Sequence, residues 1–127
     1  MGNPEGNALA VDVDAISREL RVRPEILKRI IISFSKTLTE KMFQLEGALA
    51  DDNAVFMRAL LHEIRGTSGN LRLAVVYETA KTLHEAVKAG EEKKRLQEYF
   101  DALKVCSSQL TEYAKNEESK NVENTNR

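Results

Sequence analysis

His62 is the residue of this chain whose surroundings most favour chemistry. If the segment around it is helical, with about 100° per residue, Gly66 and Gly69 fall on the same face as the imidazole. Arg58 and Arg65, at i−4 and i+3, flank it with positive charge. The apolar residues of the segment gather on the opposite side: Phe56, Met57, Leu60, Leu61 and Ile64. The pattern predicts an accessible imidazole on a helix face that lacks bulky side chains.

Two interpretations of this face are open. A glycine inside a helix costs about 1 kcal/mol relative to alanine, so two of them call for a reason. In the first interpretation, His62 is an ordinary exposed histidine and the glycines end a helix. In the second, another macromolecule approaches His62 closely and the arginines neutralise an anion placed on it. A phosphoryl group adds about −1.5 to −2 charge, which guanidinium groups bind well.

The segment from His62 to Leu71 resembles the signature of histidine phosphotransfer (HPt) domains, the phosphoryl carriers of multistep two-component signalling. The shared pattern consists of histidine, a hydrophobic residue, a basic residue, glycine, two small residues and Asn-Leu: His62, Ile64, Arg65, Gly66, Thr67, Ser68, Asn70 and Leu71. The basic residue, most often lysine, is Arg65 here. Arg72 replaces the glycine that commonly follows Asn-Leu. The likeness extends in pattern over Val13 to Tyr113.

The resemblance implies a phosphorelay function. His62 would accept a phosphoryl group from a receiver-domain aspartate and pass it to another receiver domain. Arg65 would stabilise the phosphoryl group, while Arg58, Gly66 and Gly69 would support the site. The partners would be receiver domains of a hybrid sensor kinase and of a response regulator. Such a carrier has no kinase activity of its own and needs no cofactor or metal, because the receivers carry the Mg²⁺.

The second histidine, His84, falls within the apolar stripe of a later predicted helix. One interpretation is a hydrogen-bonded core residue. The resemblance offers another, because many HPt domains have a polar side chain, often glutamine, near this position. In that case His84 would orient the imidazole of His62 and fix its tautomer.

Metal-dependent and hydrolytic sites do not fit the spacing. A zinc-protease motif needs a second histidine where Gly66 stands, and a di-iron motif needs glutamate where Ala59 and Lys81 stand. No spacing supports a site made of the two histidines and Cys106. No Ser/His/Asp arrangement or nucleophile elbow is recognisable either. We therefore expect no metal site.

Composition limits the class of protein further. A chain of 127 residues with 42% hydrophobic and 31% charged residues is typical of one globular domain. A net charge of −1 does not favour nucleic acid as a partner. One cysteine cannot form an internal disulfide. Neither a membrane-spanning apolar run nor a signal peptide is recognisable. We expect a cytoplasmic monomer that binds neither nucleic acid nor membrane.

The apolar periodicity predicts helices throughout. A short helix is expected after the capping residues Asp12 and Asp14, and a long one over Pro24–Ala50. The helix that carries His62 would start after the 51–53 cluster, and the next would end near Gly90. A last helix would follow, with apolar residues as far as Tyr113.

These elements predict an all-α fold: an antiparallel four-helix bundle with a short extra N-terminal helix. Residues 1–11 are expected to be a flexible arm, 12–115 the HPt-like bundle and 116–127 a disordered polar tail. Because a bundle alone says little about function, a non-catalytic adaptor that binds a signalling partner is the alternative.

Overall fold

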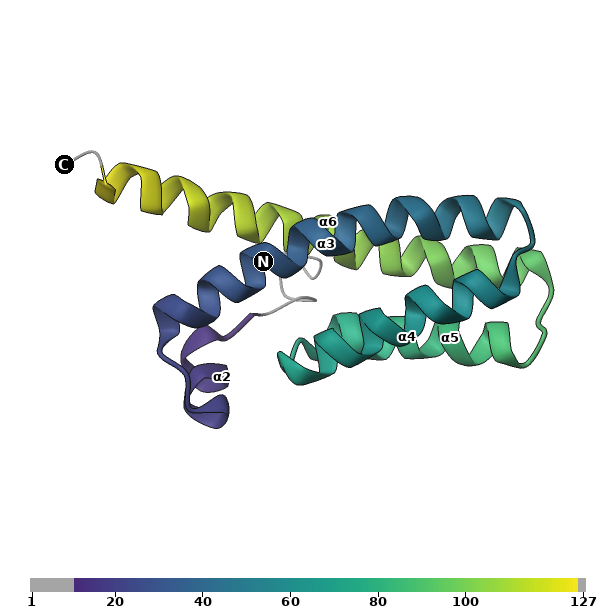
Figure 1. Ribbon diagram of the computed structural model, residues 1–127, viewed down its shortest axis with the longest axis horizontal. Helices are drawn as coiled ribbons and strands as arrows, with labels where there is room; N and C mark the ends of the chain where they lie inside the picture. The colour runs from purple at the N-terminus through teal and green to yellow at the C-terminus, as the bar shows by residue number, and fades with distance from the viewer. Residues whose placement is uncertain (1–10, 126–127) are drawn as a thin grey trace, which may run out of the picture.

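The computed structural model describes residues 11–125, all of whose regular elements are helices, so the predicted all-α class is confirmed. The helices are shown in Figure 1 and comprise α2 (Val13–Leu20), α3 (Pro24–Ala50), α4 (Ala54–Asn70), α5 (Ala74–Lys88) and α6 (Lys93–Thr125). Residues 1–10 of the predicted flexible arm lie outside the described residues. Val11, the last residue of that arm, is partly buried against the core.

Local capping chemistry sets several of the helix ends. The Asp12 side chain accepts a hydrogen bond from the Ala15 backbone N–H at 3.0 Å, and α3 begins at Pro24 as predicted. The Asn53 side chain accepts from the Phe56 N–H at 3.1 Å at the start of α4. Gly90, just beyond α5, has a φ of 73°, a left-handed conformation that favours glycine.

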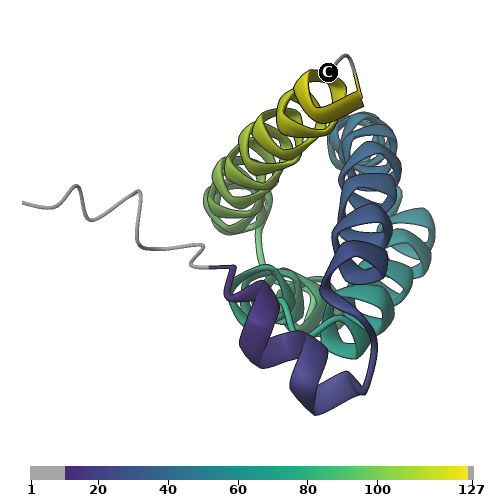
Figure 2. The ribbon, with the colours of Figure 1, turned by 90° about the vertical axis from the view of Figure 1, so that its left-hand side faces the viewer.

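Four helices, α3 to α6, pack around one hydrophobic core. Consecutive members run in opposite directions (Figure 1), and the view along the long axis shows them arranged in a ring (Figure 2). In this ring α3 contacts α4 and α6, while α5 contacts the same two helices. Burying one large apolar side chain contributes about 1.5–3 kcal/mol. The largest fully buried side chains come from all four helices: Leu27, Ile31, Leu38, Leu45, Met57, Leu61, Ile64, Val76, Leu83, Phe100, Leu103 and Leu110.

The short helix α2 packs against α3 at one end of the molecule. Its Ile16 is buried in the shared core, whereas Val13 and Leu20 are partly buried against it. A second attachment joins α2 to the turn after α4, where Glu19 forms an ion pair with Arg72. The element that precedes the ring is thus connected to the end of the helix that carries His62.

The end of α6 corrects the prediction of a disordered tail from residue 116. The helix continues through Thr125, and only 126–127 of the predicted tail lie outside the described residues. Glu117 pairs with Lys28 of α3 at 3.5 Å and with Lys120 one turn later at 3.2 Å. Glu118 pairs with Lys36 at 3.0 Å. Ion pairs to α3 and within the helix therefore support a segment that has few apolar residues.

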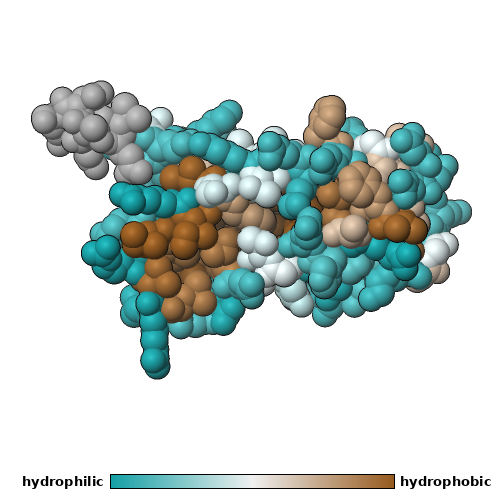
Figure 3. Space-filling model, in the orientation of Figure 1, coloured by the Kyte–Doolittle hydropathy of each residue, from teal (hydrophilic) through white to brown (hydrophobic). Residues whose placement is uncertain are grey.

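Both apolar and polar side chains are exposed on the surface. In Figure 3, apolar atoms gather near the end that carries α2 and again toward the opposite end, with polar side chains between them. Among the side chains that the structure describes, five large hydrophobic ones are exposed: Ile30, Phe43, Val55, Phe56 and Val105. Within residues 11–125, no helix combines the length and the apolar character required to cross a bilayer.

Candidate functional site

His62 lies on the outer face of α4 and is exposed, as predicted. The opposite face of the helix buries Met57, Leu60, Leu61 and Ile64 in the core. Phe56 departs from the predicted apolar face, because in the first turn of α4 it remains 41% exposed. Among the described residues, His62 makes no hydrogen bond or ion pair, so its ring nitrogens are available to an approaching molecule.

Gly66 leaves open space one turn after His62. The helix continues through this position to Asn70, so Gly66 does not end it. A Cβ atom placed on Gly66 would meet nothing within 4 Å. Packing among the described residues therefore gives no reason for a residue that costs about 1 kcal/mol in a helix. The missing side chain instead leaves room for an outside group close to the imidazole.

Gly69 is in a different environment from Gly66. A Cβ atom on Gly69 would lie 3.2 Å from Cδ1 and 3.4 Å from Cε1 of Tyr77 in α5. The missing side chain at this position therefore accommodates the tyrosine ring inside the molecule. The sequence placed both glycines on one face with His62, but the structure connects Gly69 to the packing between α4 and α5.

Arg65 links α4 to α5 through two contacts. Its Nη1 atom is hydrogen-bonded to Nδ1 of His84 at 3.0 Å. Its guanidinium carbon lies 5.9 Å from the centre of the Tyr77 ring, within the range of a cation–π contact. The side chain predicted to stabilise an anion beside His62 is therefore held in place by two residues of the next helix.

His84 is buried, with 7% of its surface exposed. Burial lowers its pKa, and electrostatic interactions with Arg65, Lys88, His62 and Arg58 lower that pKa further, in that order. We predicted that His84 would either pack in the core or orient His62. The hydrogen bond that the structure shows connects it to Arg65. No hydrogen bond joins the two imidazoles in the described part of the chain.

The charged side chains near His62 and His84 are distributed unevenly between the neighbouring helices. Arg58 is exposed on α4 and, with Arg65 and Lys88, is near enough to His84 to influence its pKa. The carboxylate next to His62 in sequence, Glu63, is instead hydrogen-bonded to Lys41 of α3 at 2.6 Å. This hydrogen bond and the charge of Lys41 lower the pKa of Glu63. Positive charge therefore gathers toward α5, while the neighbouring carboxylate is paired with α3.

The turn after α4 places Arg72 in the left-handed region, with a φ of 58°. This conformation favours glycine, the residue that HPt domains commonly have at this place. The Arg72 side chain offsets the cost by forming an ion pair with Glu19 and by donating to the Gly69 carbonyl at 3.0 Å. Arg72 thus has a structural role in connecting α2 to the end of α4.

Tyr77 is the residue of this region that the sequence did not single out as functional. It fitted the apolar stripe of its helix, together with Val76 and Ala80. A signal was present, because Tyr77 precedes His84 by seven positions, or two helical turns, and therefore shares its face. Only the packing of α5 against α4 shows that this face meets Arg65 and Gly69.

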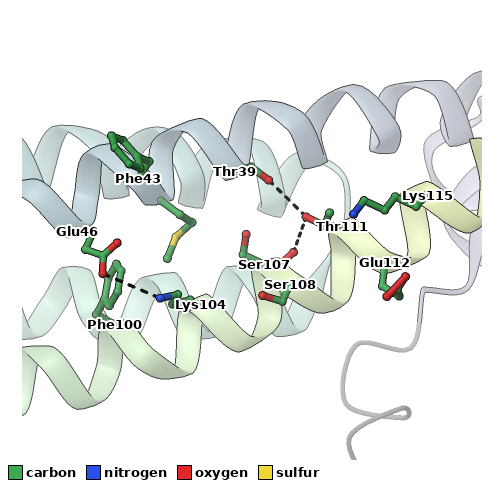
Figure 4. A pocket seen from close by; sticks show the side chains of 11 residues that line it. Thr39, Phe43, Glu46, Phe100, Lys104, Ser107, Ser108, Thr111, Glu112 and Lys115 are labelled. Atoms are coloured by element: carbon green, nitrogen blue, oxygen red, sulfur yellow. Dashed lines mark hydrogen bonds and ion pairs between the residues drawn. The ribbon is translucent and has the colours of Figure 1, made fainter.

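A separate groove of about 440 Å³ lies between α3 and α6 (Figure 4). Phe43 and Phe100 contribute apolar surface to it, and Lys104 pairs with Glu46 across it at 4.0 Å. None of its lining residues comes from α4 or α5, which carry the two histidines. Among the described residues, no three His, Cys, Asp or Glu side chains gather closely enough to hold a metal ion.

Comparisons with protein-family models, with curated proteins and with solved structures find no match to this chain.

Proposed function

We propose that this chain is a phosphorelay carrier of the HPt type. It accepts a phosphoryl group from a receiver-domain aspartate onto His62 and passes the group to another receiver domain. The observation that carries the proposal is an exposed imidazole one turn before a glycine that internal packing does not require. In this proposal α3 to α6 form the antiparallel four-helix bundle of that family, and α2 is the short extra N-terminal helix.

The transfer needs only a nucleophile that can be reached. A ring nitrogen of neutral His62 uses its lone pair to form a P–N bond, while the P–O bond to the aspartate breaks and its electrons remain on the carboxylate. The second transfer reverses these changes, with the aspartate of the next receiver as the nucleophile. Phosphoryl transfer depends mainly on positioning and charge neutralisation. Here α4 positions the imidazole, and Arg65 and Arg58 supply positive charge.

The remaining features of the proposal follow from this division of labour. The chain has no kinase activity of its own and binds no nucleotide, cofactor or metal, because the receiver supplies the aspartyl phosphate and Mg²⁺. Its partners are receiver domains of a hybrid sensor kinase and of a response regulator. In this proposal it acts in the cytoplasm as a monomer.

The decisive experiment is incubation with a receiver domain labelled on its aspartyl phosphate. We expect label to move to this chain, to be lost in acid and to survive in base, as a phosphohistidine does. The His62→Gln variant should accept none, whereas His84→Gln, which keeps His62, should still accept label. Label that persists in His62→Gln would overturn the assignment of the site. Failure of several receivers to transfer label would favour the alternative, a non-catalytic adaptor with the same fold.

A further inference from the structure

The contact between Arg65 and His84 defines the protonation state of the second histidine. A guanidinium group has five N–H donors and no acceptor. A hydrogen bond of 3.0 Å from Arg65 Nη1 to His84 Nδ1 therefore requires that Nδ1 carry no proton. The ring proton must then be on Nε2, so the contact exists only with the neutral imidazole.

The surroundings of His84 favour this neutral form. From α4, the groups that act on it are Arg58, His62 and Arg65, and from α5 itself, Lys88. No charged group of α6, the other helix that α5 packs against, is among those that shift its pKa within the described residues. Burial is the largest cause, and the electrostatic effect of these groups adds to it, so the pKa of His84 lies below the ordinary value of 6.5.

We infer that neutral His84 is a positioning residue. It holds the guanidinium of Arg65, three positions after His62 on α4, over the Tyr77 ring and releases it when His84 is protonated. Protonation would remove the acceptor and place two cations in contact. This inference rests on the proposed phosphoryl transfer, because its consequence is a transfer rate that depends on the proton of a residue other than the nucleophile. It differs from direct orientation of His62 by His84, since the effect passes through Arg65.

The geometry explains why such a device would be useful. Only one donor of Arg65 is used by His84, so other donors remain for a phosphoryl group. An arginine fixed in advance loses less side-chain freedom when the anion arrives than a freely rotating one does. The contact to Tyr77 restrains the same guanidinium from a second direction. Loss of the His84 acceptor should therefore weaken the positioning of Arg65.

The first test compares wild type with His84→Gln, using one labelled receiver between pH 8 and pH 5. The glutamine carbonyl oxygen can accept from Arg65 but does not titrate in this range. Effects of pH on other parts of the reaction, including the receiver, largely cancel when the two transfer rates are divided by one another. We expect the wild-type rate divided by the His84→Gln rate to be near one at pH 8. At pH values below 6.5 this ratio should decrease, toward the loss measured in Arg65→Ala. A ratio that stays constant with pH would overturn the inference.

A double-mutant cycle tests whether the effect passes through Arg65. His84→Ala should slow transfer about threefold to tenfold in wild type at pH 8, but should add little to Arg65→Ala, because residues that act through one another are not additive. Equal losses in both backgrounds would show that His84 acts independently of Arg65. Thermal unfolding of each variant identifies any loss that reflects folding.

Nitrogen-detected NMR of the free protein separates this inference from the proposed function, because it requires no receiver. At pH 7 we expect the His84 resonances of a ring protonated at Nε2 and unprotonated at Nδ1. A proton on Nδ1 would overturn the inference even if His62 accepts label. If neither wild type nor any variant accepts label, the proposed function fails and the control of transfer fails with it, although the tautomer remains measurable.

Discussion

The molecule contains two histidine–glycine pairs that have the same residue types and different environments. His62 and Gly66 lie on the outer face of α4, where the ring is exposed and the space above the glycine is open. His84 and Gly69 lie between α4 and α5, where Arg65 occupies the ring nitrogen and Tyr77 fills the space above the glycine. Access, rather than residue type, therefore distinguishes the proposed nucleophile, His62, from the proposed positioning residue, His84.

The largest effect on the transfer rate is expected from a bulky side chain at Gly66. Gly66→Gln should slow transfer from a receiver by about tenfold to hundredfold, because overfilling a packed contact costs about 1–3 kcal/mol. The fold should be retained, since a Cβ atom there meets nothing within 4 Å. Transfer rates at several receiver concentrations measure the effect.

Gly47 provides the matched control for this substitution. It is an exposed glycine inside α3, and a Cβ atom placed on it also meets nothing within 4 Å. Gly47→Gln should leave transfer unchanged. If the two glutamine variants transfer at the same rate, the space at Gly66 is not used by a receiver.

An effect of similar size is expected at Arg65, which belongs to both regions. Arg65→Ala should slow transfer by about one or two decades, because each 1.36 kcal/mol of lost stabilisation is a factor of ten. A charge interaction at about 4 Å contributes about 1–4 kcal/mol between water and an effective dielectric of 20. Single-turnover kinetics provide the measurement.

Arg58→Ala is the comparison for Arg65→Ala. Arg58 is exposed, and in the described part of the chain it has no hydrogen bond or ion pair that fixes its position. Its removal should therefore slow transfer less than removal of Arg65. A larger loss at Arg58 would mean that fixed placement of the guanidinium does not matter.

The smallest effect is a difference in stability between the two glycines of α4. Gly66→Ala should raise the free energy of unfolding by about 1 kcal/mol, because alanine is the better helix former. Gly69→Ala should raise it by less, because the Tyr77 ring, 3.2 Å from the added Cβ, must shift. Urea unfolding of the two variants measures the difference. Equal stabilisation would show that Tyr77 moves without cost.

Much of the fold could be predicted because its signals are local. The bounds of α3 follow from Pro24 at its start and from the turn residues after Ala50. Asp12 and Asn53 mark the starts of α2 and α4 through their own side-chain hydrogen bonds. The end of α6 was missed because ion pairs to α3 support it, and these join residues about 80 to 90 positions apart.

The features of the candidate site are likewise partly local to one helix and partly dependent on how two helices pack. The exposure of His62 and the open space at Gly66 follow from the face that α4 presents, which its own periodicity determines. The bond from Arg65 to His84 and the contact of Gly69 with Tyr77 depend on how α5 is rotated against α4. No single helix contains that information, so the sequence could place these residues on faces but could not pair them.

The ion pairs at the end of α6 have a consequence for ionic strength. Beyond Ala114, α6 is joined to α3 by Lys28–Glu117 and Lys36–Glu118, with N–O distances of 3.5 and 3.0 Å. The screening length falls from about 10 Å in 0.1 M salt to about 3 Å in 1 M salt, comparable to these distances. Glu117 is buried, so salt screens its pair with Lys28 less than the exposed pair between Lys36 and Glu118. Concentrated salt should therefore weaken Lys36–Glu118 first and expose the end of α6 to proteolysis, while the apolar core of the four helices remains intact.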